Sequence, residues 1–118
     1  MKYEIIYADP PWHYAQRRSN TTFGGGVTDK YPTMSVDEIS QIPVRDWCTD
    51  NSMLFIWCTM PYLMRCNRVI ESWGFEYVTC AFTWVKMNRT NASFFKGVGN
   101  YTKSNAELCL LARRGKPL

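Results

Sequence analysis

Residues 5–12 read Ile-Ile-Tyr-Ala-Asp-Pro-Pro-Trp, an apolar run closed by an aspartate and two prolines. A short apolar run that ends at prolines is typical of a buried strand, because proline lacks the N–H group that a sheet requires. Ligands of open α/β sheets bind beyond the carboxyl ends of the strands. The sequence therefore predicts a strand over residues 5–8 and a candidate ligand site at Asp9, directly after it.

Two helices are predicted by their start and stop signals. Ser35 and Glu38 form a capping box, which satisfies the first free amides of a short helix that Pro43 ends. A second helix is predicted over residues 62–73, with Gly74 as its stop. Its apolar side chains fall on one face and comprise Leu63, Val69, Ile70 and Trp73.

Three further apolar runs, at 52–58, 77–85 and 107–112, predict strands. Together with the first strand they alternate with helices, which indicates an α/β fold with a parallel or mixed sheet. A sheet covered on both faces commonly needs more than 118 residues. We therefore expect residues 1–118 to form a single domain that lacks its C-terminal portion, and a compact variant is the alternative.

The composition excludes several classes of protein. With 46% hydrophobic and 15% aromatic residues, the chain is neither disordered nor collagen-like. The formal net charge of +4 favours an acidic partner. Five cysteines without a Cys-x-x-Cys pair argue against a zinc site and a disulfide framework, so we expect no metal and a cytoplasmic, intracellular protein. The longest apolar stretch, 53–57, is too short to span a bilayer, so no membrane partner is expected.

The residues at the end of the first strand suit one kind of chemistry. Two rigid prolines hold the Asp9 carboxylate and the Pro10 carbonyl as neighbouring acceptors. An exocyclic amine such as that of adenine has two hydrogens, one for each acceptor, and these bonds would draw the nitrogen lone pair out of conjugation. Trp12 offers a face on which an extruded base could stack. The residues alone leave another interpretation open, a rigid turn with Trp12 in the core.

Further motifs accompany the tetrad Asp9-Pro10-Pro11-Trp12. In chain order they are Tyr31-Pro32-Thr33-Met34-Ser35, Glu38-Ile39, Leu54-Phe55-Ile56-Trp57, Pro61, Trp73-Gly74-Phe75, Trp84-Val85-Lys86 and Asn105-Ala106-Glu107-Leu108. This series resembles the MT-A70 family of adenine amino-methyltransferases over nearly the whole chain. The resemblance implies a Rossmann-like S-adenosylmethionine methyltransferase fold in permuted order, here with a partial sheet, because family members continue beyond the position of Leu118.

The resemblance also implies roles for single residues. The catalytic residues would be Asp9, Pro10, Pro11 and Trp12, with Asp9 and the Pro10 carbonyl orienting the amine and Trp12 bordering the base. The residues expected to contact the cofactor S-adenosylmethionine are Ala8, Asp9 and Lys86. Those expected to contact the substrate are Trp12, Tyr14, Arg17, Arg18 and Tyr31.

Simpler interpretations stay open for residues around these motifs. Lys86 could be a solvated lysine at a strand end, and Tyr31 could pack on the sheet. Asn105 could cap a turn, and Glu107 could open a strand. His13, the single histidine, could be an ordinary loop residue.

The placement of charge indicates a nucleic-acid partner independently of the resemblance. One stretch without acidic residues holds Arg17 and Arg18, and a second holds Lys86, Arg89, Lys96 and Lys103. Both follow predicted strands, so they could form a positive rim for phosphates around Asp9, unless they are lysines and arginines scattered over loops. We expect methylation of the adenine amine in DNA or RNA, by a protein that could act as a homodimer or heterodimer. The alternative is a non-catalytic nucleic-acid-binding or scaffold subunit of a methyltransferase complex.

Overall fold

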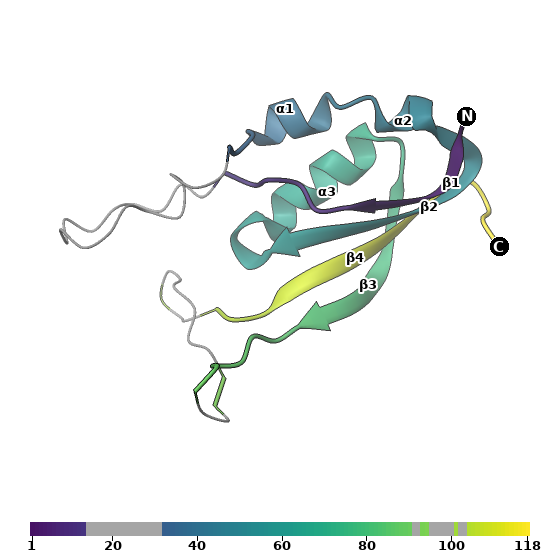
Figure 1. Cartoon of the computed structure of the whole chain (residues 1–118). Coiled ribbons are helices and arrows are strands. Elements are labelled where there is room, and N and C mark those ends of the chain that lie inside the picture. Colours follow the sequence, from purple (N-terminus) through teal and green to yellow (C-terminus); the bar gives the residue numbers. More distant parts are fainter. Residues whose placement is uncertain (14–31, 91–92, 95–100, 102–103) are drawn as a thin grey trace.

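The computed structural model describes residues 1–13, 32–90, 93–94, 101 and 104–118 (Figure 1). Four strands within these residues form one sheet in the order β1-β2-β4-β3. Their bounds are Tyr3–Ala8 for β1, Cys48–Thr59 for β2, Glu76–Trp84 for β3 and Glu107–Arg114 for β4. β1 pairs with β2 in parallel, whereas β4 is antiparallel to both of its neighbours. The predicted α/β fold with a mixed sheet is confirmed, and it is compatible with part of a Rossmann-like fold.

The helices of the described residues lie on one side of the sheet (Figure 1). They are α1 Val36–Ser40, α2 Val44–Trp47, the 3-10 turn η2 Met60–Tyr62 and α3 Leu63–Ser72. None of them is long and apolar enough to cross a membrane. The sequence did not predict α2, because Pro43 was interpreted only as the end of α1. Pro43 is also the N-cap of α2.

The capping box of α1 is confirmed. The Glu38 amide donates to Ser35 Oγ at 3.1 Å, and the Ser35 amide donates to Glu38 Oε1 at 3.1 Å. The hydrogen bond with the Ser35 backbone has the largest effect on the pKa of Glu38 and lowers it. The hydrogen bond with the Ser35 side chain lowers it further. These bonds stabilise the start of a helix that is only five residues long.

The core forms between the helices and one face of the sheet. Val69 and Ile70 of α3 are buried there, as its apolar face predicted. Cys66 of the same helix is buried as well. Trp73 donates from Nε1 to the carbonyl of Ile39 at 2.9 Å, which ties the end of α3 to α1. The other buried side chains of this core from the sheet are Cys48, Leu54, Ile56, Cys58, Leu110 and Ala112.

The opposite face of the sheet is apolar as well. Tyr3, Ile5 and Tyr7 of β1 are exposed on it, since alternate residues of a strand point to opposite faces. Phe55 of β2 stacks on Phe82 of β3, with ring centroids 6.3 Å apart. No helix of the described residues covers this face (Figure 1).

Gly74 ends α3 with a backbone φ of +85°, and a Cβ atom there would lie 2.6 Å from Arg45 Nε. We expect Gly74→Ala to lower the free energy of unfolding by about 1–2 kcal/mol, because L residues disfavour the left-handed region. Urea unfolding followed by circular dichroism measures this change. Asn67→Ala on the exposed side of α3 is the control, and equal stability of the two variants would contradict the prediction.

Candidate active site

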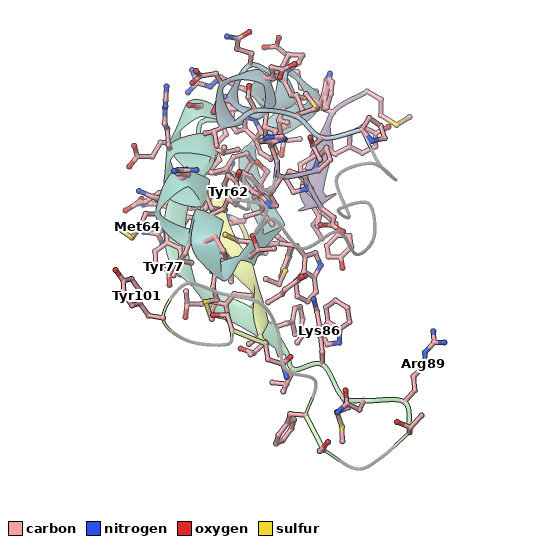
Figure 2. The ribbon with its side chains drawn as sticks, turned by 90° about the vertical axis from the view of Figure 1, so that its left-hand side faces the viewer. Tyr62, Met64, Tyr77, Lys86, Arg89 and Tyr101 are labelled. Atoms are coloured by element: carbon pink, nitrogen blue, oxygen red, sulfur yellow. The ribbon has the colours of Figure 1, made fainter. Side chains whose placement is uncertain are left out.

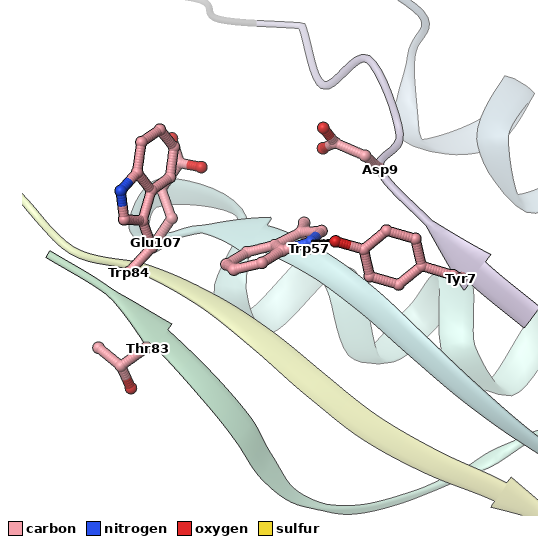
Figure 3. A pocket seen from close by; sticks show the side chains of 6 residues that line it. All are labelled: Tyr7, Asp9, Trp57, Thr83, Trp84 and Glu107. Carbon is pink, nitrogen blue, oxygen red and sulfur yellow. Dashed lines mark hydrogen bonds between the residues drawn. The ribbon is translucent and has the colours of Figure 1, made fainter. Parts of the chain in front are cut away.

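One edge of the sheet collects the ends of several strands. β1, β2 and β3 run in the same direction, because β4 is antiparallel to both β2 and β3. Their carboxyl ends therefore lie beside the first residue of β4. A hollow of about 470 Å³ lies at this edge, a volume typical of small-molecule sites. Its walls are Tyr7, Asp9, Trp57, Thr83, Trp84 and Glu107 (Figure 3).

Asp9 lies in this hollow, one residue beyond the end of β1. Its carboxylate points across the hollow toward the side on which Trp84 and Glu107 lie (Figure 3). Partial burial raises the pKa of Asp9, and the negative charge of Glu107 raises it further. A carboxylate with a raised pKa accepts hydrogen bonds and protons more readily than a fully solvated one.

The two prolines after Asp9 form a tight turn. The Trp12 amide donates to the Pro10 carbonyl at 2.9 Å, across Pro11, which is the pattern of a γ-turn. A carbonyl oxygen has two lone pairs, so that of Pro10 can still accept a second hydrogen. The Pro11 carbonyl accepts from the Met34 amide at 2.9 Å, which holds this turn in place.

Trp12 lies in the core and is only 5% exposed. Its ring stacks on Tyr62 with centroids 5.4 Å apart, and its Nε1 donates to the Trp57 carbonyl at 3.0 Å. Core side chains cover the ring, so Trp12 anchors the turn at Pro10 and Pro11. The expected stacking of a base on this ring stays a prediction.

Lys86 lies next to the hollow without lining it. Its Nζ pairs with Glu107 Oε1 at 3.0 Å and lies 5.1 Å from the centroid of the Trp84 ring. Glu107 opens β4, as the simpler interpretation had it, and also lines the hollow. The expected contact of Lys86 with a cofactor stays a prediction. A second hollow of about 680 Å³ lies on this side, lined by Trp84, Lys86, Met87, Asn88 and Arg89.

The other predicted site residues lie outside the hollow or outside the described part of the chain. Ala8, the last residue of β1, packs partly buried against the core. His13 Nδ1 lies 2.9 Å from Thr33 Oγ1 in an exposed position, which agrees with the interpretation of His13 as an ordinary loop residue. The described residues hold no group of three or more histidine, cysteine or acidic side chains that could bind a metal. The residues outside the described ranges, whose substrate contacts stay predictions, are Tyr14, Arg17, Arg18, Tyr31, Lys96 and Lys103.

Sequence reasoning missed four side chains of the hollow. They are Tyr7, Trp57, Thr83 and Trp84. Trp57 donates from Nε1 to Tyr7 Oη at 2.6 Å, so two walls are joined (Figure 3). The alternation of strand side chains could have identified Tyr7, since it stands two residues before Asp9 and thus shares its face. Nothing in the sequence placed Trp57 and Trp84 at one hollow.

The MT-A70 family model matches residues 3–118, from β1 to the last residue. The chain belongs to the MT-A70 family. The resemblance noted in the sequence is thereby confirmed.

Two relatives are similar to this MT-A70 domain along almost all of its length. Type II methyltransferase M.MunI from a Mycoplasma species is 35% identical over 98% of the chain, which covers 52% of that protein. The N(6)-adenosine-methyltransferase subunit METTL3 of Danio rerio is 26% identical over 98% of the chain, which covers 18% of it. The chain thus spans about half the length of the first relative and less than a fifth of the second.

Proposed function

We propose that this protein transfers a methyl group from S-adenosylmethionine to the exocyclic amine of adenine in DNA or RNA. The observation that carries the proposal is the Asp9 carboxylate facing a hollow that Trp57 and Trp84 also line (Figure 3). The relatives support it, since one is named a type II methyltransferase and the other an N(6)-adenosine-methyltransferase subunit. A non-catalytic scaffold is less favoured, because the complete tetrad is present and its carboxylate reaches a hollow.

The amine would be held by two oxygens of the tetrad. The Asp9 carboxylate accepts one hydrogen, and the remaining lone pair of the Pro10 carbonyl accepts the other. Both bonds strengthen as the nitrogen becomes positively charged, so they stabilise the transition state more than the ground state. The raised pKa of Asp9 supports a second role for it, in which it would take the proton that the nitrogen loses.

The chemistry of the walls fits a cationic methyl donor. S-adenosylmethionine, when bound, supplies the methyl group as an electrophile on a positively charged sulfur. The carboxylates of Asp9 and Glu107 and the indole faces of Trp57 and Trp84 are groups that attract such a cation. The residues that would hold the donor are Ala8 and Asp9 at the end of β1, together with Lys86. Their part in catalysis would be chiefly to align the donor with the amine.

Trp84 is a second aromatic side chain available to a base, since it is 52% exposed at the hollow. We expect Trp84→Ala to weaken the binding of an adenine-containing oligonucleotide about tenfold to a hundredfold, because stacking contributes about 1–3 kcal/mol per base. Fluorescence anisotropy of a labelled oligonucleotide measures the change. Trp47→Ala on α2, where the side chain is 46% exposed, is the matched control. Equal affinities of these variants would remove Trp84 from the substrate site.

The polynucleotide would pass the end of the molecule at which β3 leaves the sheet. Lys86 and Arg89 lie there (Figure 2), where both line the second hollow. Cations at such a place attract phosphates, so affinity for the oligonucleotide should fall as the salt concentration rises. Dimerisation stays a prediction. The cytoplasmic location also stays a prediction. All five cysteines are free thiols in the structure, which agrees with it.

Methyl transfer with an isotopically labelled donor tests the proposed function. The protein, as the cell makes it, is incubated with labelled S-adenosylmethionine and single- and double-stranded oligonucleotides of DNA and RNA. Mass spectrometry of the digested nucleosides should find the label on the amino group of adenine. Binding of these oligonucleotides without any transfer of label would favour the scaffold instead.

A further inference from the structure

Asn105 continues the pairing of β3 with β4 after the sheet has ended. The last backbone pair joins Trp84 to Glu107, so the antiparallel register would next bring Lys86 opposite Asn105. At this position the Asn105 side chain takes the place of a peptide group. The Lys86 amide donates to Asn105 Oδ1 at 2.8 Å, and Asn105 Nδ2 donates to the Lys86 carbonyl at 2.9 Å. Both bonds need a side-chain amide, which carries a donor and an acceptor at one end.

These two bonds determine where Lys86 leaves the sheet. Its ammonium group reaches Glu107 and the Trp84 ring, and both of these side chains line the Asp9 hollow. The Lys86 and Glu107 side chains are only 34% and 21% exposed, so water screens their interaction less than that of a surface pair. The position of the Lys86 main chain thus decides which charges lie beside Asp9.

We propose that Asn105 is a positioning residue for the methyl transfer described above, which holds the Lys86 main chain so that its ammonium group stays on Glu107 at the wall of the Asp9 hollow. This inference rests on the proposed function. Asn105 is not among the residues that line the hollow, so it acts through Lys86.

The position of Lys86 affects the charges around Asp9. The titratable groups near it are Glu107 and Cys109 on β4, Tyr7 on β1, Lys86 beyond β3 and His13 on its own segment. The negative charge of Glu107 raises the pKa of Asp9, and a cation held on Glu107 opposes this effect. When Lys86 is released, Asp9 should take up its proton at a higher pH.

Asn105→Ala is therefore expected to lower kcat about tenfold to a hundredfold with a smaller change in KM, and to move the acidic limb of the pH profile upward. Asn105→Asp keeps the size and the hydrogen-bond acceptor but loses the donor. It should therefore also lower kcat and move the acidic limb of the pH profile upward. Asn67→Ala is the control, because Asn67 lies on the exposed side of α3. Its side chain donates a hydrogen bond to Glu71 on the same helix. Thermal unfolding of each variant checks that the fold is kept.

A double-mutant cycle separates positioning from a merely structural role. If Asn105 acts through Lys86, Asn105→Ala should have little further effect on kcat in the Lys86→Met background. Independent effects of the two changes would overturn the proposal.

An NMR titration of the Asp9 carboxyl gives a readout that needs no activity. The titration should move to higher pH in Asn105→Ala and stay unchanged in Asn67→Ala. If it moves while no variant transfers methyl groups, the positioning role stands and the proposed function fails. If methyl transfer occurs and the Asn105 variants titrate as the unmodified protein does, the positioning role fails alone.

Discussion

Asp9→Asn is expected to lower kcat for methyl transfer by about a hundredfold to a thousandfold, the range found when one preorganised hydrogen-bonding group of an active site is removed. The asparagine amide has the size of the carboxylate but no charge, and it turns an NH₂ group toward the hollow in one of its two orientations. It can therefore neither balance the charge that develops on the adenine nitrogen nor take up its proton. Single-turnover measurements with labelled donor give this rate directly.

The control is Asp50→Asn, since the Asp50 side chain is 95% exposed and lies 3.8 Å from Arg114 Nη2. It makes the same change of charge far from the hollow, so its kcat should equal that of the unmodified protein. Equal rates for Asp9→Asn and Asp50→Asn would show that the carboxylate at the end of β1 takes no part in the reaction.

The pH dependence of the reaction follows from the same carboxylate. Asp9 must be ionised to accept a hydrogen of the amine, and both burial and Glu107 raise its pKa. Activity should thus be complete well above this raised pKa and decline as the pH falls through it. The acidic limb of kcat/KM should accordingly lie at higher pH than an unperturbed aspartate would give, and it should be absent from the residual activity of Asp9→Asn.

Trp12→Ala should lower the free energy of unfolding by about 3–5 kcal/mol, the usual cost of removing a large buried aromatic side chain. The variant loses the stack on Tyr62 and the bond from Nε1 to the Trp57 carbonyl. Since a domain of this kind is stable by only about 5–15 kcal/mol, much of its stability would be lost. Urea unfolding, monitored at several wavelengths, measures the change.

Two further variants show whether the buried ring is the cause. Trp12→Phe keeps a ring against Tyr62 but loses the donor, so it should cost less, about 1 kcal/mol for the hydrogen bond together with a small loss of packing. Trp47→Ala removes a half-exposed ring and should change stability little. If Trp12→Ala were as stable as Trp47→Ala and bound oligonucleotides poorly, Trp12 would be a stacking surface after all.

The strands were predictable from the sequence because each carries an apolar run. The start of β2 at Cys48, before the run at 52–58, was not predictable. Residues 49–51 are polar, and aspartate and asparagine are poor strand formers. They lie where the pairing of β1 with β2 shifts register, between the pair Tyr3–Cys48 and the pair Ile5–Met53. Tertiary pairing on either side of them thus makes them part of the strand.

The candidate site was predictable only where it is contiguous in the sequence. Asp9 and its prolines follow one strand directly, so their place at the edge of the sheet needed no knowledge of the topology. Trp57 and Trp84 meet at one hollow only because β4 lies between β2 and β3, and no local pattern reveals that order. The burial of Trp12 likewise depends on Tyr62, fifty residues further along the chain.

The proposed function requires that Asp9 and the Pro10 carbonyl each accept one hydrogen of the adenine amine. NMR spectroscopy of a single-stranded oligonucleotide with isotopically labelled adenine amino groups tests it most directly. On binding to the protein, both amino protons of the target base should move downfield and become protected from exchange, and Asp9→Asn should lose one of these shifts. Tight binding that leaves both amino protons unshifted and freely exchanging would contradict the account.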